Sequence, residues 1–268
     1  MPCWAQGMRY SWKEGASQRT IVTAIHVPEG FQRIEVEDGS FAQWLRNLPL
    51  EKEGSPVLLY NGRLKTRQDV HEAVIDIDRG TRNLQQCADA VIRLRAEYLY
   101  SKGCFSEIHF NFTSGDEAKY DQWVLGCRPV VHGSHVRWIK KTSKDGSYDN
   151  FRNYLRTVFM YAGSYSLSKE LGKRQDVSDI QIGDVFIQGG FPGHAVIVVD
   201  MTRNPATGEK VFLVAQSYMP AQDIHVLKNP NDHDHSPWYR IPDGDLFKTP
   251  EWTFRKRDLK YFPFGDCR

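Results

Sequence analysis

The sequence lacks the features that mark several large classes of protein. Its 35 basic and 33 acidic side chains nearly cancel, to a net charge of +2, so there is no electrostatic footprint for nucleic acid. No apolar run approaches the length of a membrane span, and the start lacks the apolar region of a signal peptide. Nucleotide-binding fingerprints are also absent. These absences leave an ordinary globular chain, either cytosolic or given in a processed form.

Cysteine is scarce and is not arranged as a zinc site. There is no Cys-x-x-Cys pair, which argues against structural zinc. The count is odd, so at least one thiol is free or pairs between chains. The spacing is compatible with a disulfide between Cys104 and Cys127 but does not determine it. The five cysteines are Cys3, Cys87, Cys104, Cys127 and Cys267.

A short acidic and histidine-rich segment, residues 232–235, contains the side chains that metals prefer. It reads Asp-His-Asp-His, but no second ligand cluster can be placed beside it, and such loops are usually solvated. We therefore predict no metal and no cofactor.

Hydrophobic periodicity predicts an α+β fold rather than alternating βαβ units. We expect a helix from Leu84 to Gly103 and a long helix over 147–171 with a weak point at Gly163. Three strands follow, around a glycine-rich turn and then Asn204–Lys210, as an antiparallel meander. Other expected elements are a strand pair over 21–38, a helix capped by Ser40, a hairpin turn at Asn61-Gly62, strands at 107–112 and 136–139, and a helix at 114–124.

The domain organisation predicted is a single domain over residues 1–268, because no linker divides the chain. It comprises a β-rich N-terminal section (1–83), a core (84–218) and a C-terminal extension (219–268).

Three residues form a candidate catalytic set. Cys87 lies in the first turn of the expected helix, where the helix dipole favours a thiolate and lowers the pKa. His194 begins a very apolar strand, and Gln216 lies near the end of the next strand. A nucleophile, a base and a group that orients the base are what covalent acyl chemistry needs.

Each of these residues also has a structural explanation. Cysteine is among the most buried residue types, and Cys87 shares a helix face with Val91 and Leu94. A lone histidine is more often structural, and Gln216 can satisfy backbone groups at a strand end. Asp200 is an alternative orienting residue, but it lies about 20 Å from His194 along an extended strand.

The order of helix-start cysteine, strand-start histidine and a polar residue on the following strand resembles the papain-like cysteine hydrolases of the NlpC/P60 and CHAP type. Gly183-Asp184 resembles the Gly-Asp that precedes the histidine strand in those families, and Gln86-Cys87 is similar to the start of the CHAP nucleophile helix. The chain departs from NlpC/P60 in lacking Asp-Cys-Ser-Gly, and its third residue is not histidine.

This resemblance implies a papain-like core, a cysteine-bearing helix packed on an antiparallel sheet, over residues 84–218. It also implies an oxyanion hole built from the backbone N–H of Cys87 with the side chain of Gln86 or Gln188. Gly193, with Gly189 and Gly190, either lets substrate approach the strand edge or only makes the turn.

A second resemblance covers nearly the whole chain. SFAQWLRNLPL, GSPVLLYNGRLK, QCADAVIRLRAEYL, IHFNFTSG, YLRTVFMYAGSYSL, IGDVFIQGGFPGHAVIVVD and AQSYMPAQDIHVL resemble the bacterial DUF4846 family. Many members of that family carry export signals, which implies an exported or periplasmic protein whose signal is absent from this sequence.

The functional hypothesis is a papain-like cysteine hydrolase that cleaves an amide or ester bond through Cys87, His194 and Gln216. Its expected partner is a peptide, glycopeptide or acyl substrate, for example in the cell wall. The alternative is a non-catalytic carbohydrate- or peptide-binding protein of the cell envelope, since seven Trp and twelve Tyr could line a groove.

Overall fold

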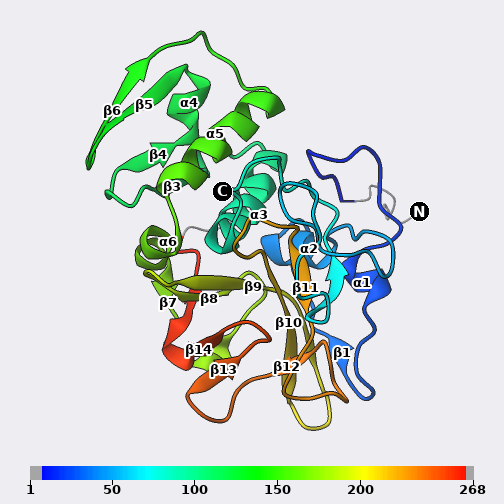
Figure 1. The fold of residues 1–268 in the computed structure, drawn as a ribbon. Coiled ribbons are helices and arrows are strands. Elements are labelled where there is room, and N and C mark those ends of the chain that lie inside the picture. Colours follow the sequence, from blue (N-terminus) through cyan, green and yellow to red (C-terminus); the bar gives the residue numbers. More distant parts are fainter. Residues whose placement is uncertain (1–7, 264–268) are drawn as a thin grey trace.

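An antiparallel sheet forms the centre of the computed structural model, which describes residues 8–263. Its strands follow the order β2-β11-β10-β9-β8-β15-β7, with β1 also paired to β9 and β12 to β10 (Figure 1). The bounds are β1 Gln32–Arg33, β2 His71–Val74, β7 Gly172–Lys173, β8 Val185–Gln188, β9 His194–Arg203, β10 Lys210–Gln216, β11 His225–Leu227, β12 Tyr239–Arg240 and β15 Leu259–Tyr261.

The middle of the sheet is the predicted meander of β8, β9 and β10. Residues 195–202 of β9 are buried along their whole length, so the strand is covered on both faces. Its continuous apolar run is typical of such a strand. The chain turns between β8 and β9 at Gly189–Gly193, where Gln188 lies opposite His194.

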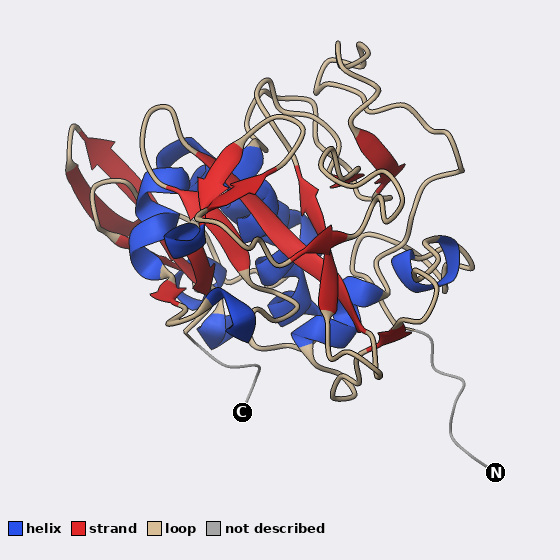
Figure 2. Ribbon diagram, turned by 90° about the horizontal axis from the view of Figure 1, so that it is seen from below, coloured by secondary structure: helices blue, strands red, loops and turns tan. Residues whose placement is uncertain are grey.

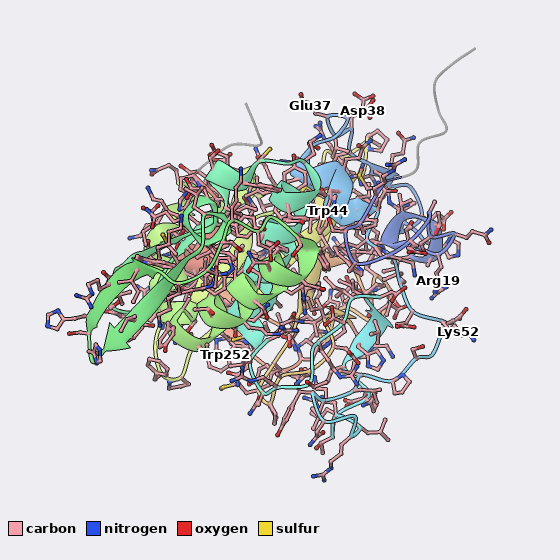
Figure 3. The ribbon with its side chains drawn as sticks, turned by 90° about the horizontal axis from the view of Figure 1, so that it is seen from above. Arg19, Glu37, Asp38, Trp44, Lys52 and Trp252 are labelled. Carbon is pink, nitrogen blue, oxygen red and sulfur yellow. The ribbon has the colours of Figure 1, made fainter. Side chains whose placement is uncertain are left out.

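Most helices lie on one side of the long strands (Figure 2). The main one is α3 (Cys87–Ser101), which packs on β9 and has residues 87–99 buried. Beside it lies α2 (Phe41–Arg46), capped by the Ser40 hydroxyl as predicted. Trp44 of α2 points into the molecule, whereas Glu37 and Asp38, just before this helix, lie at the outer edge (Figure 3).

A separate lobe is formed by the segment that follows α3 (green in Figure 1). It holds two small hairpins and three α-helices. Tyr120 and Tyr148 of this lobe and Tyr100 of α3 pack around Phe151. The elements are η1 Phe105–Glu107, β3 His109–Asn111, β4 Glu117–Lys119, α4 Tyr120–Val124, β5 Cys127–His132, β6 His135–Lys140, α5 Tyr148–Tyr161 and α6 Ser164–Glu170.

The remaining elements lie at the two ends of the described chain and around the sheet. They are α1 Ile21–Ala24, η2 Val177–Asp179, β13 Leu246–Lys248, β14 Thr253–Arg255 and η3 Lys256–Asp258. β13 and β14 pair as a hairpin, at the lower left in Figure 1.

The mixed α+β class is confirmed, but two local predictions are wrong. Residues 21–24 form a helix instead of a strand, because Thr20 and Thr23 cap each other's backbone N–H groups in a capping box. Residues 114–124 are helical only from Tyr120, since Glu117–Lys119 pairs with β3. The expected break near Gly163 is present, between α5 and α6.

Asp200 has a structural position far from His194 on β9. Its carboxylate is fully buried and accepts from Arg33 Nε and Arg46 Nε, both at 2.7 Å. This cluster ties β1 and α2 to the middle of the sheet.

The cysteines that the structure describes do not form the pair that the spacing allowed. Cys104 is disulfide-bonded, whereas Cys127 and Cys87 are free thiols. Cys3 and Cys267 lie outside the described residues. Within residues 8–263, no helix is long and apolar enough to cross a membrane.

Candidate active site

Cys87 is the first residue of α3, and its position is fixed by contacts at the helix start. The Asp89 carboxylate accepts from the Gln86 backbone N–H at 3.0 Å, which stops the helix from extending backwards. The hydroxyl of Ser217, directly after β10, lies 3.0 Å from the Gln85 carbonyl oxygen and 2.9 Å from that of Gln222, and it shares its proton between them. The end of β10 therefore holds the start of α3, and with it Cys87, close to Gln216.

His194 and Gln216 form a direct, buried hydrogen bond. The distance from His194 Nε2 to Gln216 Oε1 is 2.8 Å, and both side chains are almost inaccessible to solvent. They lie on adjacent strands, β9 and β10, as the sequence pattern predicted.

The partners of Gln216 determine which way its amide faces. Its Nε2 donates to Glu251 Oε2 at 2.7 Å and lies 3.4 Å from His225 Nε2. His225 Nδ1 donates to the Asp223 carbonyl at 2.9 Å, which leaves its Nε2 as an acceptor. The amide nitrogen therefore has two acceptors, and the amide oxygen must face His194.

This chain of hydrogen bonds fixes the tautomer of His194. Because Gln216 presents an oxygen, His194 Nε2 carries the proton and Nδ1 keeps its lone pair. Nδ1 has no hydrogen-bond partner among the described residues. Glu251 stays an acceptor because it is ion-paired with the buried Lys65.

Aromatic rings enclose the His194 imidazole on several sides. The ring centroids of Tyr218, Trp252 and Phe254 lie 4.8, 5.3 and 5.8 Å from that of His194. Trp252 (labelled in Figure 3) is held in turn by Gln188, whose Oε1 accepts from its indole N–H at 3.2 Å. These aromatic rings shield the His194 imidazole from water.

The Cys87 sulfur contacts the main chain on both sides of His194. Its S–H donates to the Gly193 carbonyl at 4.0 Å, and the Ala195 backbone N–H is directed at the sulfur. Cys87 and His194 make no direct hydrogen bond in this structure. The structure thus places the thiol against the backbone of the two residues that flank His194.

The pKa values show that both groups are neutral at pH 7. Burial raises the pKa of the Cys87 thiol to about 11, with a smaller contribution from the nearby Asp89 charge. Burial also lowers the pKa of His194 to about 4. The expected lowering of the Cys87 pKa by the helix start is wrong here, because desolvation outweighs the N–H groups that favour a thiolate.

A cavity of about 240 Å³ opens beside Cys87. Gln86 and Gly193 line it, whereas His194 and Gln188 are not among its lining residues. Gln86 Nε2 is held by Asn83 Oδ1 at 3.2 Å, on the cavity wall. Gln188 is exposed, and its amide oxygen accepts from the Trp252 indole N–H. Of the two glutamines, Gln86 is therefore the candidate oxyanion donor.

Gly189 and Gly193, between β8 and β9, are required by the packing of the turn against α6. A Cβ atom on Gly193 would lie 2.6 Å from the Gly190 carbonyl oxygen, and nearer still to Ser164 Oγ. A Cβ on Gly189 would collide with Ser168 in the same way. Their small size therefore allows close approach of this helix.

The Asp-His-Asp-His segment forms local contacts through Asp232, with a hydrogen bond to His235 and an ion pair to Arg240. Asp232 Oδ2 lies 2.8 Å from His235 Nδ1 and 3.2 Å from Arg240 Nε. Across the described part of the chain, no group of three or more metal-ligating side chains comes together.

Sequence reasoning missed the residues that complete the site from outside 84–218. Lys65 comes from the N-terminal section, and Glu251 and Trp252 come from the turn between β13 and β14. Tyr218, inside that range, also contacts His194. Among these residues it alone had a local signal in the sequence, because it lies two residues after Gln216 and so projects near it.

We predict that removing the Glu251–Lys65 pair releases the His194 tautomer. In the double variant Glu251→Leu/Lys65→Met, the Gln216 amide loses a hydrogen bond to a charged group, which is worth ~1.5–3 kcal/mol. The preference for the amide orientation that points its oxygen at His194, over the flipped orientation, should therefore fall by about 10- to 100-fold. The ¹⁵N chemical shifts of the His194 imidazole should then show a mixture of the two neutral tautomers, instead of the Nε2–H tautomer alone. Exposed Glu72→Gln serves as the control, and unchanged shifts in the double variant would refute the assignment.

The chain belongs to the DUF4846 family, described as a domain of unknown function, whose model matches residues 21–261. No curated protein and no solved structure matches the chain.

Proposed function

We propose that this protein is a cysteine hydrolase of the papain-like type that cleaves an amide or ester bond. Cys87 is the nucleophile, His194 the general base and Gln216 the residue that orients the base. The observation that carries the proposal is the buried His194–Gln216 bond, next to a cysteine at a helix start. This order of groups is similar to that of NlpC/P60 and CHAP hydrolases.

The reaction begins from a neutral thiol and a neutral imidazole. As the Cys87 sulfur attacks the substrate carbonyl, His194 Nδ1 accepts the thiol proton. The Gln216 amide oxygen, which accepts from His194 Nε2–H, stabilises the imidazolium that forms. The oxyanion is held by the Cys87 backbone N–H and the Gln86 amide. The leaving group takes the proton from His194, and a thioester to Cys87 remains.

Water completes the cycle. His194 Nδ1 removes a proton from the water that attacks the thioester, and the acid product leaves as the proton returns to sulfur. Catalytic hydrogen bonds are often long in free enzymes and tighten in the substrate complex, so the Cys87–His194 bond is expected to form there.

Two further points bear on the substrate and the compartment. The expected substrates are peptides, glycopeptides or acyl compounds, as the family resemblance implies. Cys104 is disulfide-bonded, and disulfides persist in oxidising compartments, which supports an exported protein.

A non-catalytic binding protein is the second candidate. It is favoured by the burial of Cys87, which is 7% exposed, and by the raised thiol pKa. In that case the cavity would bind a ligand and Cys87 would only line its wall.

Replacing Cys87 by Ala distinguishes the two functions. We expect the hydrolysis of 4-nitrophenyl esters and peptide anilides to fall by at least about 10³-fold, because the nucleophile is lost. Cys127→Ala, which removes the other free thiol among residues 8–263, should keep full activity. Wild-type protein with no turnover, or a Cys87→Ala variant as active as the wild type, would reject the cysteine hydrolase in favour of the binding protein.

A further inference from the structure

The cavity beside Cys87 is mainly apolar. Its volume of about 240 Å³ equals roughly eight waters at ~30 Å³ each, enough for one short chain or ring. The larger apolar side chains that line it are those of Leu84, Phe159, Tyr165, Phe191, Pro192 and Met219.

Its rim is unusually exposed for apolar residues. Phe191, in the turn between β8 and β9, is 92% exposed, and Met219, just after β10, is 53% exposed. Tyr165 of α6 is also exposed. Three segments thus present apolar side chains around one opening, and contiguous exposed patches of this kind mark binding sites.

The cavity wall, within the described part of the chain, carries hydrogen-bond donors at the start of α3 but no cationic side chain. No Lys, Arg or His lines it among the described residues. The ionisable side chains on its wall are Cys87, Tyr165 and Asp89, whose carboxyl is buried and has no hydrogen-bond partner on Oδ1. Burial raises the pKa of Asp89 to about 8, so at alkaline pH a carboxylate or phosphate in the cavity would face a second anion. An uncharged apolar group loses no partner by leaving water.

We propose that this cavity is the specificity subsite for an uncharged, apolar group next to the reacting carbonyl. The substrate class is then an ester or amide whose acyl or amine portion carries an aliphatic or aromatic chain. The inference rests on the proposed hydrolase only for the reaction, because the cavity and its charge are independent of catalysis. It disfavours substrates with a free carboxylate at this position.

The test compares the rates at which Cys87 is alkylated by N-ethyl, N-butyl and N-hexyl iodoacetamide and by iodoacetate, at one alkaline pH. Each buried methylene contributes ~0.8 kcal/mol, so the rate should rise up to about fourfold per methylene until the cavity is full. Iodoacetate should be the slowest reagent. Mass spectrometry of the Cys87 peptide gives each rate.

Two variants locate the effect. Phe191→Ser should flatten the dependence on chain length. Leu125→Ser should keep it, because Leu125 is also apolar and exposed but does not line the cavity. A flat series in the wild type, an unchanged slope in Phe191→Ser, or faster labelling by iodoacetate would overturn the subsite.

The same data separate this inference from the proposed function. Alkylation needs only access to the thiol and not turnover. A chain-length dependence without any hydrolysis would retain the subsite and reject the enzyme. Hydrolysis with a flat alkylation series would do the reverse.

Discussion

His194→Ala is expected to lower kcat/KM for ester hydrolysis by about 10²- to 10⁴-fold, the usual contribution of a positioned general base. The loss should appear mainly in kcat, since His194 does not line the cavity. His132→Ala, at an exposed position in β5, is the matched control and should have no effect. Initial rates with a 4-nitrophenyl ester measure both variants.

The pH profile of the wild type checks the same prediction. His194 acts as a base only when it is neutral, so activity should fall as the pH drops through about 4. The Cys87 thiol keeps its proton up to about pH 11, so no second change in activity is expected between pH 5 and pH 10. An acid limb near pH 6.5, or a His194→Ala variant as active as the wild type, would contradict the assignment of His194 as the buried base.

Asp200→Ala is expected to destabilise the fold by ~3–5 kcal/mol, because it leaves the buried guanidinium of Arg46 and the partly buried guanidinium of Arg33 without their counter-ion. Urea unfolding followed by tryptophan fluorescence measures the change, and Trp44 of α2 lies close to the affected cluster.

Asp69→Ala is the control for this substitution. Asp69 is exposed and paired with the exposed Arg67, so its removal should not shift the urea midpoint measurably. Equal midpoints for Asp200→Ala and the wild type would mean that the arginines find other partners or water.

The sheet centre and the start of α3 could be predicted from the sequence because their signals are local. The apolar run of β9, the turn after Gln188 and the helical period after Cys87 each depend on neighbouring residues. Gln216 could be proposed because consecutive strands usually pair.

The rest depends on contacts between distant segments. Lys65 and Glu251 are separated by 186 positions, and nothing near either residue indicates the ion pair. The prediction that the Cys87 pKa is lowered was wrong for a similar reason. Burial of the thiol by the rest of the fold decides this pKa, and the helix start alone does not. At residues 21–24, alternation suggested a strand, but the Thr20–Thr23 capping box is the stronger local feature.

The most direct test of the central claim is to look for the acyl-enzyme itself. The protein is mixed with a 4-nitrophenyl ester at pH 7, quenched in acid, and its intact mass and peptides are measured. The account predicts one acyl group on Cys87 in the wild type and none there in His194→Ala. Acylation of Cys87 at the same rate in His194→Ala, or adducts only on lysines, would show that Cys87 and His194 do not work as nucleophile and base.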